Sequence, residues 1–142
     1  MLVFVASGYG GDDDSTGPQV NPDFMVGEWI AESMVVTSKA NPEVAPDIIQ
    51  PLSNATFTLS VQPSGRYLAI LAGYGQASSE SGVLTVEGQY IIFMRQLPSP
   101  EESRARWGRT GSSVILEGDT DFHFNLDGIM ESATHRTEIV PR

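Results

Sequence analysis

The sequence predicts an all-β fold: an antiparallel sandwich or barrel of about eight or nine short strands, with little helix. Short apolar stretches alternate with polar residues at a period of two, as in residues 56–61 (TFTLSV), which is the pattern of a strand with one buried face. Clusters rich in Gly, Pro, Asn and Ser follow about every 8–12 residues, a spacing typical of antiparallel sandwiches and barrels. The best helix candidate, residues 41–53, contains three prolines and cannot form a continuous helix.

The first strand is expected over residues 27–37 (GEWIAESMVVT). The other strands are expected as four hairpins, which pair residues 56–61 with 66–72, 83–86 with 89–95, 104–109 with 113–117, and 121–125 with 133–140. Two longer loops are expected at residues 41–53 and 96–103, with one turn of helix over residues 43–49 as an alternative. Residues 89–95 have apolar residues on both faces, which suits a barrel whose outer wall is partly covered by the Pro-rich loop or by a partner. Closure into a barrel would also remove exposed sheet edges.

Length and charge exclude several classes of protein. The chain has 142 residues, which fits one folded domain, and a net charge of −10 from 8 basic and 18 acidic residues. So acidic a chain repels phosphate groups, which argues against nucleic-acid binding and against docking on anionic membranes. The sequence contains no cysteine, which excludes disulfides, thiolate metal sites and a cysteine nucleophile. No stretch approaches the roughly 20 apolar residues of a spanning helix.

Residues 1–23 differ in composition from the rest of the chain. An apolar run (MLVFVA) is followed by the small residues Ser7 and Gly8 and then by a Gly- and Asp-rich stretch that ends before Phe24. This order predicts a signal-peptide remnant and a flexible acidic linker in residues 1–23, ahead of a barrel in residues 24–142. An edge strand or a frayed terminus is the alternative for the apolar run.

The N-terminal stretch also resembles the processing site of bacterial lipoproteins. Residues 5–8 (VASG) are similar to the residues before the lipidated cysteine, and the acidic tether that follows is similar as well. Tyr9 stands where that family has its cysteine, so this chain has no sulfur for a thioether-linked lipid. The resemblance implies export to the periplasm, the cell envelope or the extracellular space.

The remainder resembles the lipocalin-like domain of small bacterial secreted proteins. The Gly27-Glu28-Trp29 segment is similar to the Gly-x-Trp signature, and residues 57–67 and 82–90 are similar to the hairpins that follow it. The resemblance implies a small antiparallel up-and-down β-barrel of about eight strands that binds a small apolar ligand. It also implies that Gly27 and Trp29 close one end, with Trp29 stacked on Arg136 or, as the less favoured choice, on Arg142.

Large apolar and aromatic side chains are the candidates for lining a cavity, because small barrels can leave apolar pockets of ligand size. These candidates are Trp29, Phe57, Leu59, Tyr67, Tyr90, Phe93, Phe122 and Phe124. The alternative is a filled barrel that acts as a structural, protein-interaction or inhibitor module with an unknown protein partner. No residue pattern specifies a reaction, a cofactor or a metal site, so we expect no enzyme activity.

Two polar groupings are predicted to lie on outer faces. Oxygen-bearing residues and His123 alternate from Asp119 to Asp127, which favours one solvated strand face over a calcium loop. Arg104, Arg106 and Arg109 are expected to balance acidic residues on neighbouring strands. An anion-binding wall inside the barrel is the alternative for these arginines.

Overall fold

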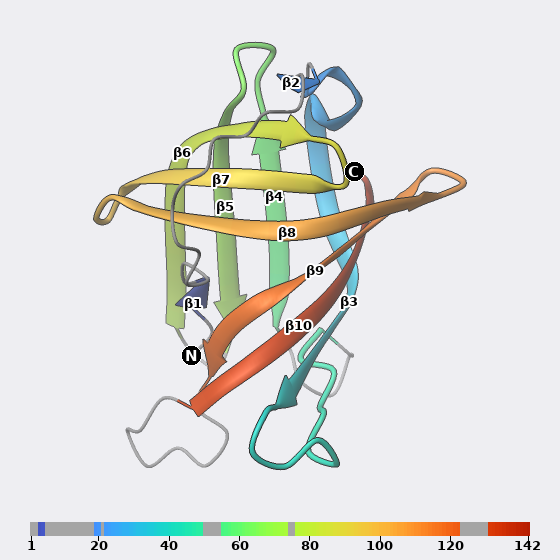
Figure 1. Cartoon of the computed structure of the whole chain (residues 1–142), viewed down its shortest axis with the longest axis vertical. Coiled ribbons are helices and arrows are strands. Elements are labelled where there is room, and N and C mark those ends of the chain that lie inside the picture. The colour runs from blue at the N-terminus through green and yellow to red at the C-terminus, as the bar shows by residue number, and fades with distance from the viewer. Residues whose placement is uncertain (1–2, 5–18, 21, 50–54, 74–75, 123–130) are drawn as a thin grey trace.

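The predicted all-β barrel is confirmed. A computed structural model describes residues 3–4, 19–20, 22–49, 55–73, 76–122 and 131–142 (Figure 1). Eight antiparallel strands follow one another in up-and-down order, and the last pairs with the first to close the barrel. These strands are β3 (Gly27–Ser38), β4 (Thr56–Val61), β5 (Arg66–Gly73), β6 (Gln76–Glu87), β7 (Tyr90–Leu97), β8 (Glu101–Thr110), β9 (Ser113–Phe122) and β10 (Glu131–Pro141).

Three short elements precede the barrel. Strand β1 (Val3–Phe4) pairs with β9, β2 (Gln19–Val20) pairs with β6, and the 3₁₀ helix η1 (Pro22–Met25) leads into β3. Residues 3–4 of the apolar run, for which an edge strand was the alternative, and residues 19–20 of the expected linker therefore each add to a sheet edge. The small residues before Tyr9, and Tyr9 itself, lie outside the described residues. Within the described part of the chain, no helix has the length and apolar character to cross a membrane.

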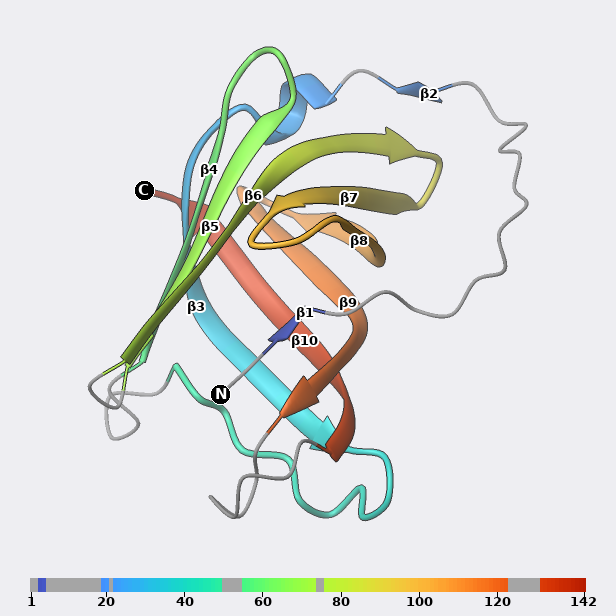
Figure 2. The same cartoon turned by 90° about the vertical axis from the view of Figure 1, so that its left-hand side faces the viewer.

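Strand β6 bends the sheet from one half of the barrel to the other (Figure 2). Its first half pairs with β5, whereas its second half pairs with β7, and the β7 register shifts between Ser81 and Gly82. A side chain at position 82 would put its Cβ 2.1 Å from the carbonyl oxygen of Met94. Glycine therefore allows the two backbones to approach at this bend.

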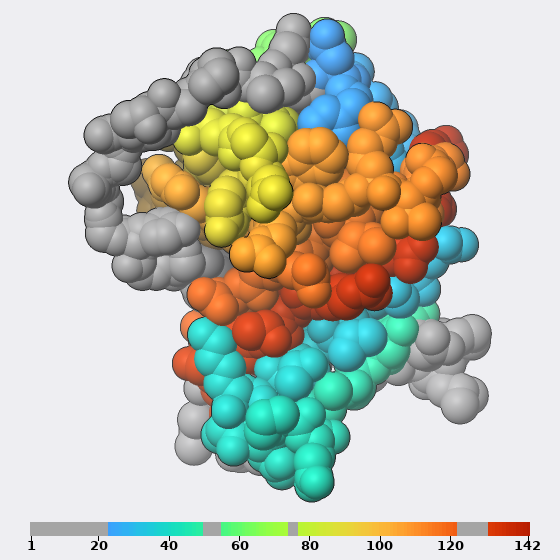
Figure 3. Space-filling model, turned by 45° about the vertical axis from the view of Figure 1, so that its right-hand side comes forward, coloured from blue at the N-terminus to red at the C-terminus, as the bar shows by residue number. Residues whose placement is uncertain are grey.

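The core lies inside the barrel and follows the alternation of each strand. Inward residues are buried and outward residues are exposed or half-buried, as β10 shows with Ala133, His135, Thr137 and Ile139 inside. Met25 of η1 is fully buried and belongs to the same apolar cluster, so η1 covers one end of the barrel. Strands β8, β9, β10 and β3 form a continuous wall on one face (Figure 3).

The Pro-rich loop after β3 protects an edge. Beyond Ile30, the described part of β3 no longer pairs with β4, and the loop returns along this edge. The amide of Val36 donates to the Pro46 carbonyl at 3.0 Å, and the amide of Ile48 donates to the Met34 carbonyl at 3.0 Å. The alternative of a helical turn over residues 43–49 is wrong. Backbone groups of this loop form hydrogen bonds with β3 instead of with one another.

Three expected boundaries change. The loop predicted at residues 96–103 shortens to three residues, since β7 runs to Leu97 and β8 begins at Glu101. Strand β6 begins at Gln76 rather than at Val83, because β5 supplies partners along its polar first half. The expected strand over 121–125 is not separate where it is described: Asp121 and Phe122 end β9, which itself pairs with β10. Residues 123–125 lie outside the described residues.

Candidate functional site

A pocket of mixed polarity lies among the described residues of the barrel. Its enclosed part measures ≈ 20 Å³, room for about one water molecule, and the space among its lining atoms out into open solvent is ≈ 480 Å³. The apolar lining residues are Phe57, Leu59, Ala69, Phe93, Ala105 and Leu116. The polar lining residues are Tyr67, Glu80, Ser103, Arg104, Asp119, His135 and Thr137.

Strands β8 and β9 separate beside this pocket. They pair only between Ala105–Gly118 and Thr110–Ser113, so residues 101–104 pair with β7 alone. Residues 119–122 of β9 pair with β10, and β1 pairs with the other edge of β9 at positions 120 and 121. Figure 1 shows the two strands diverging toward β1. Residues from both sides of this separation line the pocket.

A tyrosine and a glutamate meet on one wall of the pocket. The Tyr67 hydroxyl donates a 2.7 Å hydrogen bond to Oε2 of Glu80, and the Tyr67 ring meets the Phe93 ring edge-on at 5.3 Å. Burial is the main cause that raises the pKa of Glu80, and the nearby Glu101 raises it further, while Tyr67 and Arg95 oppose the rise. Burial and the Glu80 charge raise the pKa of Tyr67 strongly, so it remains a hydrogen-bond donor.

Two ion pairs hold other charged side chains around the pocket, one near Glu80 and one that includes Asp119 of the lining. The Arg95 guanidinium lies 3.0 Å from Glu101 and also donates to the Ser99 carbonyl at 2.8 Å. Lys39 lies 3.0 Å from Asp119 at the end of β3. Arg95 and Glu101 are mostly shielded from solvent, whereas the Lys39–Asp119 pair is partly exposed.

A buried histidine lies on the opposite wall. His135 has only 5% of its surface exposed, and its Nδ1 lies 2.9 Å from Oγ1 of Thr137. Burial lowers the pKa of His135 to about 4, and the carboxylate of Asp119 opposes this shift only in part. At neutral pH the imidazole is therefore uncharged and offers one donor and one acceptor. Gly118 leaves room for it, because a Cβ there would lie 3.3 Å from His135 Nε2.

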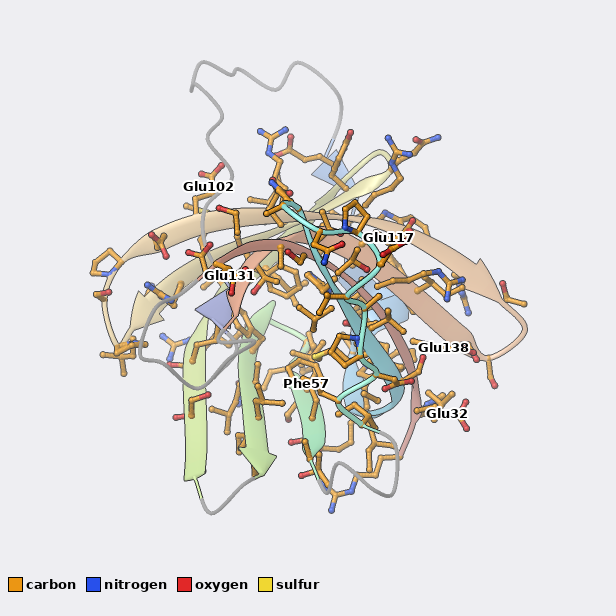
Figure 4. All side chains as sticks on the ribbon, turned by 90° about the horizontal axis from the view of Figure 1, so that it is seen from below. Glu32, Phe57, Glu102, Glu117, Glu131 and Glu138 are labelled. Carbon is orange, nitrogen blue, oxygen red and sulfur yellow. The ribbon has the colours of Figure 1, made fainter. Side chains whose placement is uncertain are left out.

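The structure brings together half of the predicted cavity residues. Phe57, Leu59, Tyr67 and Phe93 line the pocket, and Figure 4 shows Phe57 pointing into the barrel. The cavity prediction for Tyr90 is wrong: it lies on the outward face of β7 and is 37% exposed. The side chain of Phe122 and the whole of Phe124 lie outside the described residues.

The predicted pairing of Trp29 with Arg136 is also wrong. In the β3–β10 register Trp29 lies opposite Pro141, whereas Arg136 lies opposite Val35. Arg136 points outward with 53% of its side chain exposed, 3.9 Å from Glu117. Trp29 is buried among core residues rather than in the pocket lining. Its indole nitrogen donates a 2.8 Å hydrogen bond to the carbonyl of Met25.

Gly27 keeps a role at this closed end of the barrel. It has a φ of 131°, a backbone conformation that other residues rarely adopt, between η1 and the first residues of β3. The turn it makes brings the Met25 carbonyl of η1 within hydrogen-bond distance of the Trp29 indole nitrogen. The closed end is therefore held by η1 rather than by Arg136, while the backbone amide of Arg142 donates a 2.9 Å hydrogen bond to the Glu28 carbonyl beside Trp29.

Replacing Trp29 with phenylalanine tests this correction. The change removes the donor to the buried Met25 carbonyl and part of the packing, and we expect a loss of roughly 1–3 kcal/mol in the free energy of unfolding. Arg136→Ala is expected to change it by less than about 0.5 kcal/mol. Urea denaturation of both variants and the double variant would show additive effects. Non-additive changes in the free energy of unfolding would instead indicate that Trp29 and Arg136 interact.

The remaining polar predictions divide between the inner and outer faces. Arg106 lies opposite Glu117 across β8 and β9, as expected for an outer face, and Figure 4 places Glu117 outside the barrel. Arg104 and Asp119 instead contribute to the pocket lining beside the strand separation. His123 lies outside the described residues. No group of three or more His, Asp or Glu suited to a metal ion occurs in the described part of the chain.

Sequence reasoning missed Glu80 and His135, two of the polar residues that line the pocket. Glu80 lies in a polar run (SSES) without apolar alternation, so no strand face could be assigned to it. The inward position of His135 could have been predicted, because it lies at every-second-residue spacing with Ala133, Thr137 and Ile139 on the buried face of β10. Comparison with protein-family models, with curated proteins and with solved structures finds no match to this chain.

Proposed function

We propose that this protein is a lipocalin-like binding module that holds a small amphipathic molecule in the pocket between β5, β6 and β10. The observation that carries the proposal is the mixed lining of the pocket, with Phe57 and Phe93 beside Glu80 and His135. Binding pockets combine an apolar surface with a few polar groups that orient the ligand. Export to the periplasm or cell envelope belongs to the same proposal and rests on the N-terminal resemblance alone.

A wholly apolar ligand fits this lining less well than the resemblance implies. Such a ligand would displace water from Glu80, Ser103 and His135 without offering hydrogen bonds in return. Each buried polar group left without a partner costs on the order of 1–3 kcal/mol. A ligand with an apolar body and a polar end meets both parts of the lining.

A filled barrel that works through its outer surface is the second candidate. The enclosed volume of ≈ 20 Å³ favours it, because typical ligand pockets measure roughly 300–1,000 Å³. The outer face of β5–β7 also exposes three large apolar side chains: Leu68 at 43%, Met94 at 50% and Leu97 at 63%. Leu68 and Leu97 lie on either side of Ser81 in the sheet, so they belong to one surface.

Titration with 1-aminoanthracene, a small fluorescent amphipathic probe, separates the two candidates. Binding in the pocket predicts a saturable rise in fluorescence at one probe per chain. Ala69→Leu adds volume to the pocket lining and is expected to weaken this binding at least tenfold, with circular dichroism confirming the fold. Leu68→Ala is the matched control on the outer face of the same strand. Loss of binding in Leu68→Ala alone, or no binding at all, favours the filled barrel.

A further inference from the structure

We infer that the ligand of this pocket is a small organic amine, bound as a cation whose ammonium group pairs with Glu80. The inference rests on the proposed function and adds the chemical class of the ligand. Its starting point is a carboxylate inside the barrel whose described partner is an uncharged hydroxyl.

Glu80 is held in place but keeps capacity to bind. Its neighbour across β5 and β6 is Ala69, a small residue that leaves space on the pocket side. Tyr67 occupies Oε2, and no described residue donates a hydrogen bond to Oε1. A carboxylate can accept about four hydrogen bonds, so an ammonium group with its three donors finds acceptor sites here.

Among the residues that the structure describes, no basic side chain forms an ion pair with Glu80. Arg95, the basic residue that acts electrostatically on Glu80, pairs with Glu101 at 3.0 Å. The other acidic group of the lining, Asp119, pairs with Lys39 at 3.0 Å. The described residues do not provide a positive charge at ion-pair distance from Glu80, and a cationic ligand would supply one.

Several other side chains of the lining suit the remainder of such a molecule, although the basic residue Arg104 also belongs to the lining. Tyr67 and Phe93 present aromatic rings next to the carboxylate, and aromatic faces attract organic cations. His135 is neutral at physiological pH and adds no positive charge that would repel a cation. The net charge of −10 gives the whole protein a field that attracts cations toward it.

Calorimetric titration with three probes of one shape tests the inference: 2-phenylethylamine, 2-phenylethanol and phenylacetic acid at pH 7.5. We expect the amine to bind at least tenfold more tightly than the alcohol, and the acid to bind most weakly. Glu80→Gln keeps an acceptor for Tyr67 but removes the charge, so it should bring amine affinity down to that of the alcohol.

Glu102→Gln is the matched control, because it removes one negative charge from the exposed outer face of β8 (Figure 4). It should leave the preference for the amine unchanged. Tighter binding of the alcohol or acid, or an unchanged preference in Glu80→Gln, overturns the amine inference while the proposed binding function stands. Failure of all three probes together with 1-aminoanthracene overturns both. Failure of these three alone, with 1-aminoanthracene bound, overturns only the amine.

Discussion

Gly82→Ala is expected to lower the free energy of unfolding by on the order of 3 kcal/mol or more. The added Cβ would lie 2.1 Å from the Met94 carbonyl oxygen and 2.9 Å from the Arg95 Cα. Both contacts are with backbone, so no side-chain rotation relieves them. The β6–β7 pairing must open at the bend that joins the two halves of the barrel.

Gly108→Ala is the matched control. This glycine also lies in a barrel strand, but a Cβ there meets no atom within 4 Å. Its stability should change by less than about 0.5 kcal/mol. Guanidinium denaturation followed by tryptophan fluorescence measures both variants. Equal stability of Gly82→Ala and the parent protein would show that the two strands do not approach as described.

Acidification below pH 6.5 is expected to remove about 3 kcal/mol of stability through His135 alone. Its pKa falls from 6.5 in the unfolded chain to about 4 in the barrel. Between these values the unfolded state binds a proton that the folded state does not. The free energy of unfolding therefore decreases as the pH falls, and the loss is complete below about pH 4.

His135→Gln isolates this contribution, because glutamine can hydrogen-bond to Thr137 but does not titrate in this range. The variant should lose less stability than the parent between pH 7 and pH 4, by about 3 kcal/mol. Urea denaturation of both proteins at several pH values measures this difference. The carboxylates contribute to the pH dependence of both proteins, so their contribution cancels in the comparison. A histidine pKa near 6.5 by NMR would contradict the buried, neutral imidazole.

The strands with clear alternation could be predicted from local sequence. Residues 56–61 and 66–72 became β4 and β5 nearly as expected, because apolar residues at every second position fix which face is buried. The Gly-containing turns within three hairpins could also be predicted, because glycine is favoured where a turn needs a positive φ angle. Gly65, Gly88 and Gly111 have such angles, which other residues rarely adopt.

The segments without alternation could not be predicted in this way. Residues 76–82 (QASSESG) have no apolar face, yet they form the first half of β6, because β5 offers a complete ladder of partners. Glu101 and Ser103 belong to β8 because β7 supplies their hydrogen bonds. Pairing with a neighbouring strand overrides weak local preference in both places.

The sequence by itself determined the all-β class of this protein, the approximate number of its strands and several residues of its pocket. Phe57, Leu59, Tyr67 and Phe93 were identified because apolar alternation marks the residues that face inward. Only the tertiary structure decided which side chains meet across the barrel. Register sets Trp29 against Pro141 instead of Arg136, and the closed sheet brings Glu80 and His135 to one pocket. Period-two alternation gives the face of a residue but not its height along the barrel, and contacts between distant strands depend on that height.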